Sequence, residues 1–159
     1  MSGQSPRVSY QDFTKAAPSV HAALLALGNA VDESGLEKEL TELIKLRASQ
    51  INQCAFCLQL HLNMARKLGI GAPKLDLVAV WREAGVFTAR EMAALAWTEA
   101  LTMDAGRGAS DANYAALLKE FSQSEAMFLT VAIGAINQWN RIAAALGFTP
   151  PIPRDAGAS

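Results

Sequence analysis

Apolar positions recur at intervals of three and four residues along almost the whole chain, with no stretch of strict alternation. This period is that of an amphipathic α-helix, whereas a half-buried strand would alternate. The pattern therefore predicts an all-α fold, a bundle of about six to seven helices. The expected helices cover residues 10–30 with an interruption at Pro18, then 36–51, 54–68, 73–81, 88–103, 110–120 and 122–146.

Local signals support several of these boundaries. Thr88 and Ser122 each precede a glutamate at the third following position, which is the capping-box pattern of a helix start. Pro18 can begin a helical turn but cannot continue one, because it lacks a backbone N–H. Gly69 and Gly147 follow apolar helical segments, where glycine commonly ends a helix.

Two charged residues of the second helix have contrasting positions. On a helical wheel Glu42 falls beside Lys38 and Lys45, away from the leucine arc, so the periodicity alone predicts a solvated glutamate. Arg47 falls in the middle of the apolar arc. A buried arginine needs a paired acceptor, so we expect an ion pair or a side chain that reaches out to solvent.

The last helix is apolar on most of its faces, which is typical of a helix at the centre of a fold or against another subunit. We favour assembly into a homo-oligomer, because one subunit of this size has few other elements with which to cover such a helix.

Composition limits the possible classes. The 159 residues are 51% hydrophobic and 18% charged, which suits one domain over residues 1–153, and we expect a disordered tail at 154–159. The formal net charge of −1 gives no reason to expect nucleic acid or an anionic membrane as partner. No segment approaches the roughly 18 apolar residues of a membrane span, and the first residues lack a secretory pattern. We therefore expect a cytoplasmic protein.

The chemistry concentrates in the spacing Cys-x2-Cys-x3-His, formed by Cys54, Cys57 and His61. Cys57 and His61 are four residues apart, so on a helix they share one face. The helix start would lower the pKa of Cys54, whereas His61 would accept the proton of Cys57. We favour Cys57 as the attacking thiol, because a histidine can both accept and return a proton.

Other interpretations of the motif stay open. A structural zinc site would need four ligands, and Cys54, Cys57 and His61 leave it one short, although a catalytic zinc with three protein ligands is possible. Both cysteines could also pack simply as small apolar groups. No glycine-rich phosphate loop is present, so no bound nicotinamide or flavin is implied, and electrons would come from an external thiol.

The stretch from Glu42 to His61 resembles the alkylhydroperoxidase AhpD-like branch of the carboxymuconolactone decarboxylase family. The shared pattern is Glu-x11-Cys-x2-Cys-x3-His, and Glu42, Cys54, Cys57 and His61 all fall in register. The decarboxylase branch usually lacks the cysteine pair, so the pair argues against lactone decarboxylation.

The resemblance implies an all-helical subunit that assembles as a homo-trimer or homo-hexamer. It implies a thiol peroxidase for hydrogen peroxide or organic hydroperoxides, in which Cys57 becomes a sulfenic acid and Cys54 condenses with it to a disulfide. An external dithiol or thiol protein would then restore the pair. His61, assisted by Glu42, would deprotonate Cys57.

The chain departs from the best-studied branch of this family at Phe56, where that branch has a second histidine directly before the second cysteine. We therefore expect proton handling to differ from that branch. Two alternatives therefore remain: a disulfide reductase or lipoyl-type carrier with little peroxidase activity, and a redox sensor whose disulfide changes its assembly without turnover.

Overall fold

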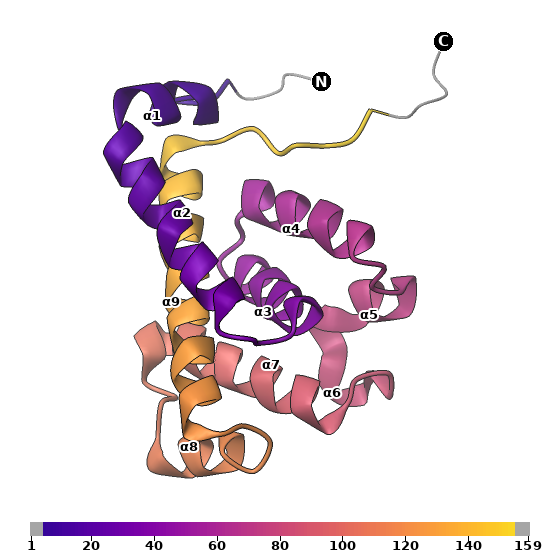
Figure 1. Ribbon diagram of the computed structural model, residues 1–159. Coiled ribbons are helices and arrows are strands. Elements are labelled where there is room, and N and C mark those ends of the chain that lie inside the picture. Colours follow the sequence, from indigo (N-terminus) through magenta and orange to yellow (C-terminus); the bar gives the residue numbers. More distant parts are fainter. Residues whose placement is uncertain (1–4, 155–159) are drawn as a thin grey trace.

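The computed structural model describes residues 5–154 and is all-α over that range, with nine α-helices and two short 3₁₀ helices (Figure 1). The elements are α1 (Tyr10–Ala16), α2 (Pro18–Glu33), α3 (Lys38–Ile51), α4 (Ala55–Lys67), α5 (Ala72–Leu77), η1 (Val78–Val80), α6 (Trp81–Ala84), α7 (Ala89–Thr102), η2 (Met103–Gly106), α8 (Asp111–Leu117) and α9 (Gln123–Leu146). The all-α prediction is confirmed. The predicted tail lies outside the described residues, apart from Arg154.

Most predicted boundaries hold within a few residues, and the differences have local causes. The first predicted helix is two helices, because the residue before a proline avoids the helical region and Ala17 has φ −129° and ψ 57°. The predicted fourth helix divides into α5, η1 and α6. The sixth ends at Leu117 and not at Glu120. Both predicted capping boxes are present, at the starts of α7 and α9.

Helix α3 is the central element of the bundle. In Figure 1 it lies between α9, which runs the length of the molecule beside α2, and α4. Residues of α3 take part in three apolar clusters: Leu40 and Ile44 in one with α7 and α9, Leu43 and Leu46 in another with α5 to α7, and Ala48 in the one that holds both cysteines. The cysteines therefore lie against the most buried helix of the fold.

Helix α9 is less central than its composition indicated. One face packs inward, including Leu129, Ile133 and Ile136, while Met127 is 56% and Val131 42% exposed. One face of the helix is therefore part of the core, and the opposite face exposes apolar side chains to solvent in the single subunit.

The partly buried Arg47 forms an ion pair, which is one of the two arrangements expected from the sequence. Its Nε donates to Oε1 of Glu99 at 2.8 Å, and Nη2 of Arg82 lies 2.6 Å from the other oxygen. The indole N–H of Trp81 also donates to Glu99, at 3.0 Å. Glu99 therefore joins α3, α6 and α7 in the core.

The two ends of the described chain converge on one end of α9. The backbone N–H groups of Arg7 and Val8 both donate to the carbonyl of Leu146, at 3.0 and 3.1 Å. The C-terminal segment is tied to α4 by a hydrogen bond from the Asn63 side chain to the Pro151 carbonyl. Within residues 5–154 no helix has the length and apolar character needed to span a membrane.

Candidate active site

The two cysteines stand at the start of α4, directly after a turn at Gln53. Gln53 has a φ of 53°, in the left-handed region that non-glycine residues seldom adopt. The turn places Cys54 at the N-cap, where its Sγ accepts a hydrogen bond from the backbone N–H of Cys57 at 3.4 Å. A sulfur atom thus occupies the position at which a helix presents unpaired N–H groups and the positive end of its dipole.

The environment makes the two thiols unequal in acidity. The hydrogen bond donated by the Cys57 thiol lowers the pKa of Cys54 to about 7, against the opposing effect of burial. The same hydrogen bond raises the pKa of Cys57, and burial raises it further. The Asn140 side chain lowers the pKa of both thiols. Cys54 is therefore the more acidic member of the reduced pair.

His61 is held from the neighbouring helix by Glu42. Oε2 of Glu42 lies 2.7 Å from Nδ1 of His61, and Oε1 accepts from Nζ of Lys45 at 3.1 Å. Burial raises the pKa of the Glu42 carboxyl, but the hydrogen bond from His61 and the charges of His61 and Lys45 outweigh it, and the net pKa is lowered. An ionised carboxylate accepts the Nδ1–H, which leaves Nε2 as the basic nitrogen of a neutral ring.

The prediction of a solvated Glu42 from periodicity is wrong, because its side chain is 0% exposed. The helical wheel placed Glu42 correctly on the polar side of α3, but α4 packs over that side. A buried carboxylate without partners would be costly, and here His61 and Lys45 supply them. The resemblance, and not the periodicity, indicated the correct environment.

Asn140 of α9 is a site residue that the sequence reasoning missed. It is buried, its amide nitrogen donates to Oγ of Ser49 at 3.0 Å, and its oxygen accepts from the Asn52 side chain at 2.9 Å. Its position against both thiols places an amide donor beside the cysteine pair. The available signal was an asparagine at the helical spacing that continues the apolar positions Ile133 and Ile136, since a buried amide requires specific partners.

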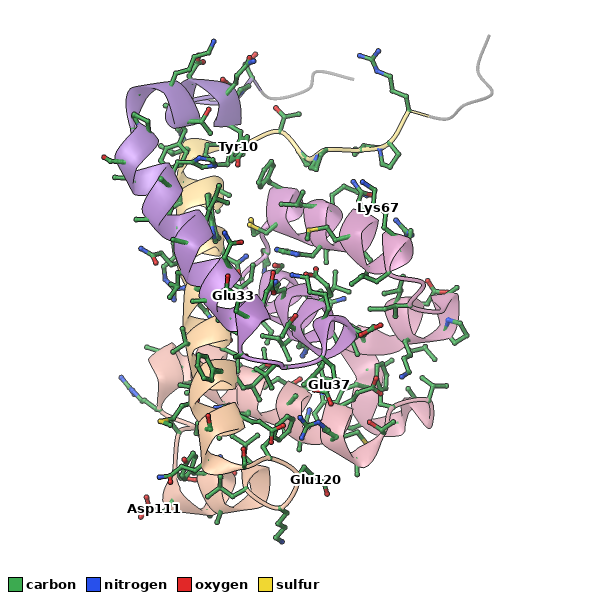
Figure 2. All side chains as sticks on the ribbon, viewed as in Figure 1. Tyr10, Glu33, Glu37, Lys67, Asp111 and Glu120 are labelled. Carbon is green, nitrogen blue, oxygen red and sulfur yellow. The ribbon has the colours of Figure 1, made fainter. Side chains whose placement is uncertain are left out.

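Cys57 and His61 open onto one cleft of about 230 Å³ between α2, α4 and α9. Cys54 is not among the residues that line it. Most of the lining is apolar or aromatic: Leu24, Leu25, Val31, Phe56, Leu60, Met64, Ile136 and Trp139, with Gly28 and Tyr10. Figure 2 shows Tyr10 above the first turn of α4, where its ring lies 5.5 Å from that of Phe56. A ligand in this cleft would reach Cys57 before Cys54.

His21 of α2 is hydrogen-bonded to α1. Its Nε2 lies 2.7 Å from the hydroxyl oxygen of Tyr10, and its ring makes edge contacts with Phe13 and Trp139. It therefore joins α1 to α2 and α9 beside the cleft.

The structure thus brings the four predicted residues into two contacting pairs, Cys54 with Cys57 and Glu42 with His61. Cys57 and His61 link the pairs, because both line the cleft. Within residues 5–154 no group of three or more His, Cys, Asp or Glu side chains is arranged to hold a metal ion.

The geometry defines an AhpD-like helical protein with a cysteine pair at a helix start, and comparison with known proteins gives its family. The family model of the carboxymuconolactone decarboxylase family matches residues 18–100. The uncharacterized protein YdfG of Bacillus subtilis (strain 168) is 32% identical over 143 residues, which cover 90% of this chain and 95% of YdfG. The chain therefore belongs to the carboxymuconolactone decarboxylase family.

Two solved structures show how widely the fold is shared. A protein of unknown function from Agrobacterium tumefaciens, described as a candidate antioxidant defence protein AhpD, superposes with a TM-score of 0.87 at 43% identity and covers 94% of this chain and 100% of its own. The debrominase Bmp8 superposes with a TM-score of 0.78 at 19% identity, over 86% of this chain and 74% of its own. At that identity the second likeness shows the fold alone.

Proposed function

We propose that this protein is a thiol-dependent peroxidase that reduces hydrogen peroxide or organic hydroperoxides through the Cys54/Cys57 pair. The observation that carries the proposal is the cleft that Cys57 and His61 share while the buried Glu42 holds His61 at 2.7 Å. A buried thiol that lines the cleft, a base one turn away and a second thiol in contact are the groups that the reaction requires.

In the first step Nε2 of His61 accepts the proton of the Cys57 thiol. The thiolate attacks the terminal oxygen of the hydroperoxide, the O–O bond breaks, and Cys57 becomes a sulfenic acid while an alkoxide or hydroxide leaves. The leaving group takes the proton from His61 and departs as an alcohol or water. The negative charge of Glu42 stabilises the imidazolium between these two transfers.

In the second step Cys54 resolves the sulfenic acid. Its sulfur attacks the sulfur of Cys57, a disulfide forms, and the hydroxyl of the sulfenic acid leaves as water with the thiol proton. An external dithiol or thiol protein then reduces the disulfide by exchange and is itself oxidised to a disulfide. The N-cap position of Cys54 favours this step, because the helix start stabilises a thiolate, which is the attacking species.

Acidity and access favour different cysteines as the first nucleophile. Cys54 has the lower pKa, but Cys57 lines the cleft. Because the thiols are hydrogen-bonded to each other, the charge left after one deprotonation can reside on either sulfur. We assign the attack to Cys57, since a peroxide in the cleft meets that sulfur.

We also propose that the protein works as a homo-oligomer, a trimer or hexamer. Exposed apolar side chains on two neighbouring helices support this: Val20 and Leu27 on α2, and Met127 and Val131 on α9. Burying them between subunits would remove apolar surface from water. A cytoplasmic location suits an activity that consumes reducing thiols.

A disulfide reductase is the second candidate, favoured by one observation. A thiol with a pKa of about 7 at a helix start is well matched to thiol–disulfide exchange near neutral pH. Such an enzyme would exchange rapidly with a dithiol and react slowly with peroxide.

Peroxide consumption by the purified protein with a dithiol donor tests the proposal, beside the Cys57→Ser variant. We expect turnover in the wild type and none in the variant, because a serine cannot form the sulfenic acid. Wild-type rates in Cys57→Ser would contradict the proposal. Absence of peroxide turnover, with the disulfide still cycling against the dithiol, would favour the reductase.

A further inference from the structure

The cleft beside Cys57 provides apolar contacts from three helices. Leu24 of α2, Leu60 and Met64 of α4, and Ile136 and Trp139 of α9 all line it. An apolar cavity of roughly 150 Å³ is known to hold a benzene ring, so a cleft of about 230 Å³ has room for a small aromatic or branched aliphatic group. Hydrogen peroxide would leave most of these contacts unused.

The charged residues of the cleft are engaged with one another. Nζ of Lys38 lies 2.6 Å from Asp32, and Nζ of Lys45 lies 3.1 Å from the buried Glu42. These ion pairs neutralise the lysines that line the cleft. The cleft is therefore best suited to bind a neutral hydrocarbon group of a ligand.

Gly28 is the unusual residue of this lining. It lies in the interior of α2, where glycine is less favourable than alanine, and it has an ordinary helical backbone without a positive φ. A Cβ built on Gly28 would meet no atom within 4 Å. Neither the backbone conformation nor close packing requires glycine at this position. Because Gly28 lines the cleft and has no side chain, the cleft is wider than it would be with a larger residue there.

We infer that Gly28 determines substrate size in this protein, by leaving the cleft beside Cys57 wide enough for the hydrocarbon part of an organic hydroperoxide. The inference rests on the proposed peroxidase function and deepens it. The group would lie against Trp139 and Met64, with its hydroperoxide end toward Cys57 and His61.

A graded pair of variants, Gly28→Ala and Gly28→Leu, tests this inference. The matched control is Gly134→Leu. Gly134 is an exposed glycine of α9, and a Cβ built on it would also meet no atom within 4 Å. Unlike Gly28, it does not line the cleft. For each protein, kcat/KM is measured with cumene hydroperoxide and with hydrogen peroxide.

We expect the ratio of the two kcat/KM values to fall stepwise from wild type to Gly28→Ala to Gly28→Leu, by about tenfold or more in the last. Gly134→Leu should keep the wild-type ratio. A constant ratio in Gly28→Leu, whether both rates fall together or neither changes, would overturn the inference. Circular dichroism confirms that each variant is folded.

A second measurement separates this inference from the peroxidase proposal. Alkylation of Cys57 by iodoacetamide, which is small, is compared with alkylation by N-phenylmaleimide, which is bulky, in a Cys54→Ser background by mass spectrometry. Gly28→Leu should slow the bulky reagent about tenfold more than the small one.

The outcomes of the two measurements are distinct. Selective slowing of the bulky reagent in a protein without peroxidase activity would support the cleft and refute the peroxidase. Peroxidase activity with equal slowing of both reagents would refute the role of Gly28 and leave the peroxidase proposal intact. If light scattering shows that Gly28→Leu dissociates an oligomer while both ratios stay constant, a second subunit occupies the cleft and the inference fails.

Discussion

Oε2 of Glu42 and Nδ1 of His61 lie 2.7 Å apart although they belong to different helices and are 19 residues apart in the chain. The contact aligns the imidazole, fixes which nitrogen carries the proton, and places a negative charge where an imidazolium would form. Glu42 does not line the cleft, so in the proposed mechanism it acts through His61 as a positioning residue.

Replacing Glu42 with glutamine tests this role. The amide retains the size of the side chain but loses the charge, so we expect kcat/KM for peroxide to fall about tenfold to hundredfold, less than the roughly 10²–10⁴-fold contribution of a general base. In the pH profile, the difference from the wild type should shrink as the pH falls through the lowered pKa of the Glu42 carboxyl, because protonated Glu42 also lacks the charge. Glu39→Gln, an exposed change on the same helix, is the control. An unaltered profile in Glu42→Gln would remove Glu42 from the mechanism.

The order of cysteine attack can be read from sulfenic acid trapping. In Cys54→Ser the resolving thiol is absent, so peroxide should leave a sulfenic acid at Cys57 that a dimedone-type probe labels. We expect labelling at Cys57, located by peptide mass spectrometry. Strong labelling of Cys54 in Cys57→Ser, with none in Cys54→Ser, would mean that the helix start and not the cleft selects the nucleophile.

The pKa of Cys54 predicts how reactivity depends on pH. The pKa is lowered from about 9 to about 7, so the thiolate forms as the pH rises through 7 and is lost below it. The rate of iodoacetamide alkylation should therefore rise with pH, with a midpoint near 7, and level off before the pH at which an ordinary thiol ionises. The ultraviolet absorbance of the thiolate gives an independent midpoint. A midpoint near 9 would show that the hydrogen bonds to Cys54, above all the one from the Cys57 thiol, do not stabilise the thiolate.

Asn140→Leu should affect both reactivity and stability. The change removes the amide that lowers the pKa of both thiols, so the alkylation midpoint should move to higher pH. It also removes the hydrogen bond to the buried Ser49 hydroxyl and one of the two that the Asn52 amide donates, which should cost about 1–3 kcal/mol of the free energy of unfolding. Gln138→Leu, on the exposed side of the same helix, should change neither. A loss of stability with an unchanged alkylation midpoint would show that Asn140 has only a structural role.

The ion cluster around Glu99 predicts a stability effect away from the cleft. Glu99→Ala leaves the half-buried Arg47 without its carboxylate and should lower the free energy of unfolding by about 3 kcal/mol in urea titration. The pKa of Glu99 is lowered in the fold, so this contribution is present above the carboxyl's ordinary pKa and lost as the pH falls. The variant should therefore lose less stability in acid than the wild type. Glu83→Ala, at an exposed glutamate, is the control.

Local patterns predicted much of the fold. The period of apolar residues predicted each long helix, and the capping boxes at Thr88 and Ser122 predicted two starts to the residue. These features succeed because a helix is stabilised by contacts within one or two turns. The break at Pro18 follows in the same way from proline's own geometry.

The candidate site was predictable only in part. The spacing of Cys54, Cys57 and His61 is a property of a single helix, so their proximity could be expected. The environment of Glu42 could not be derived from its own helix, because a helical wheel does not show what packs against each face. Asn140 lies 91 residues from its partner Ser49, beyond the reach of any local period.

The sequence by itself thus determined the helices and the redox-capable groups, because both depend on neighbouring residues and on side-chain chemistry. Tertiary packing decided the rest: α4 covers Glu42, α9 brings Asn140 to the thiols, and α2 closes a cleft over Cys57. These relationships depend on how apolar faces from distant segments are buried together. That packing places the Asn140 amide where it lowers the pKa of Cys54, and it lets Cys57 line a cleft.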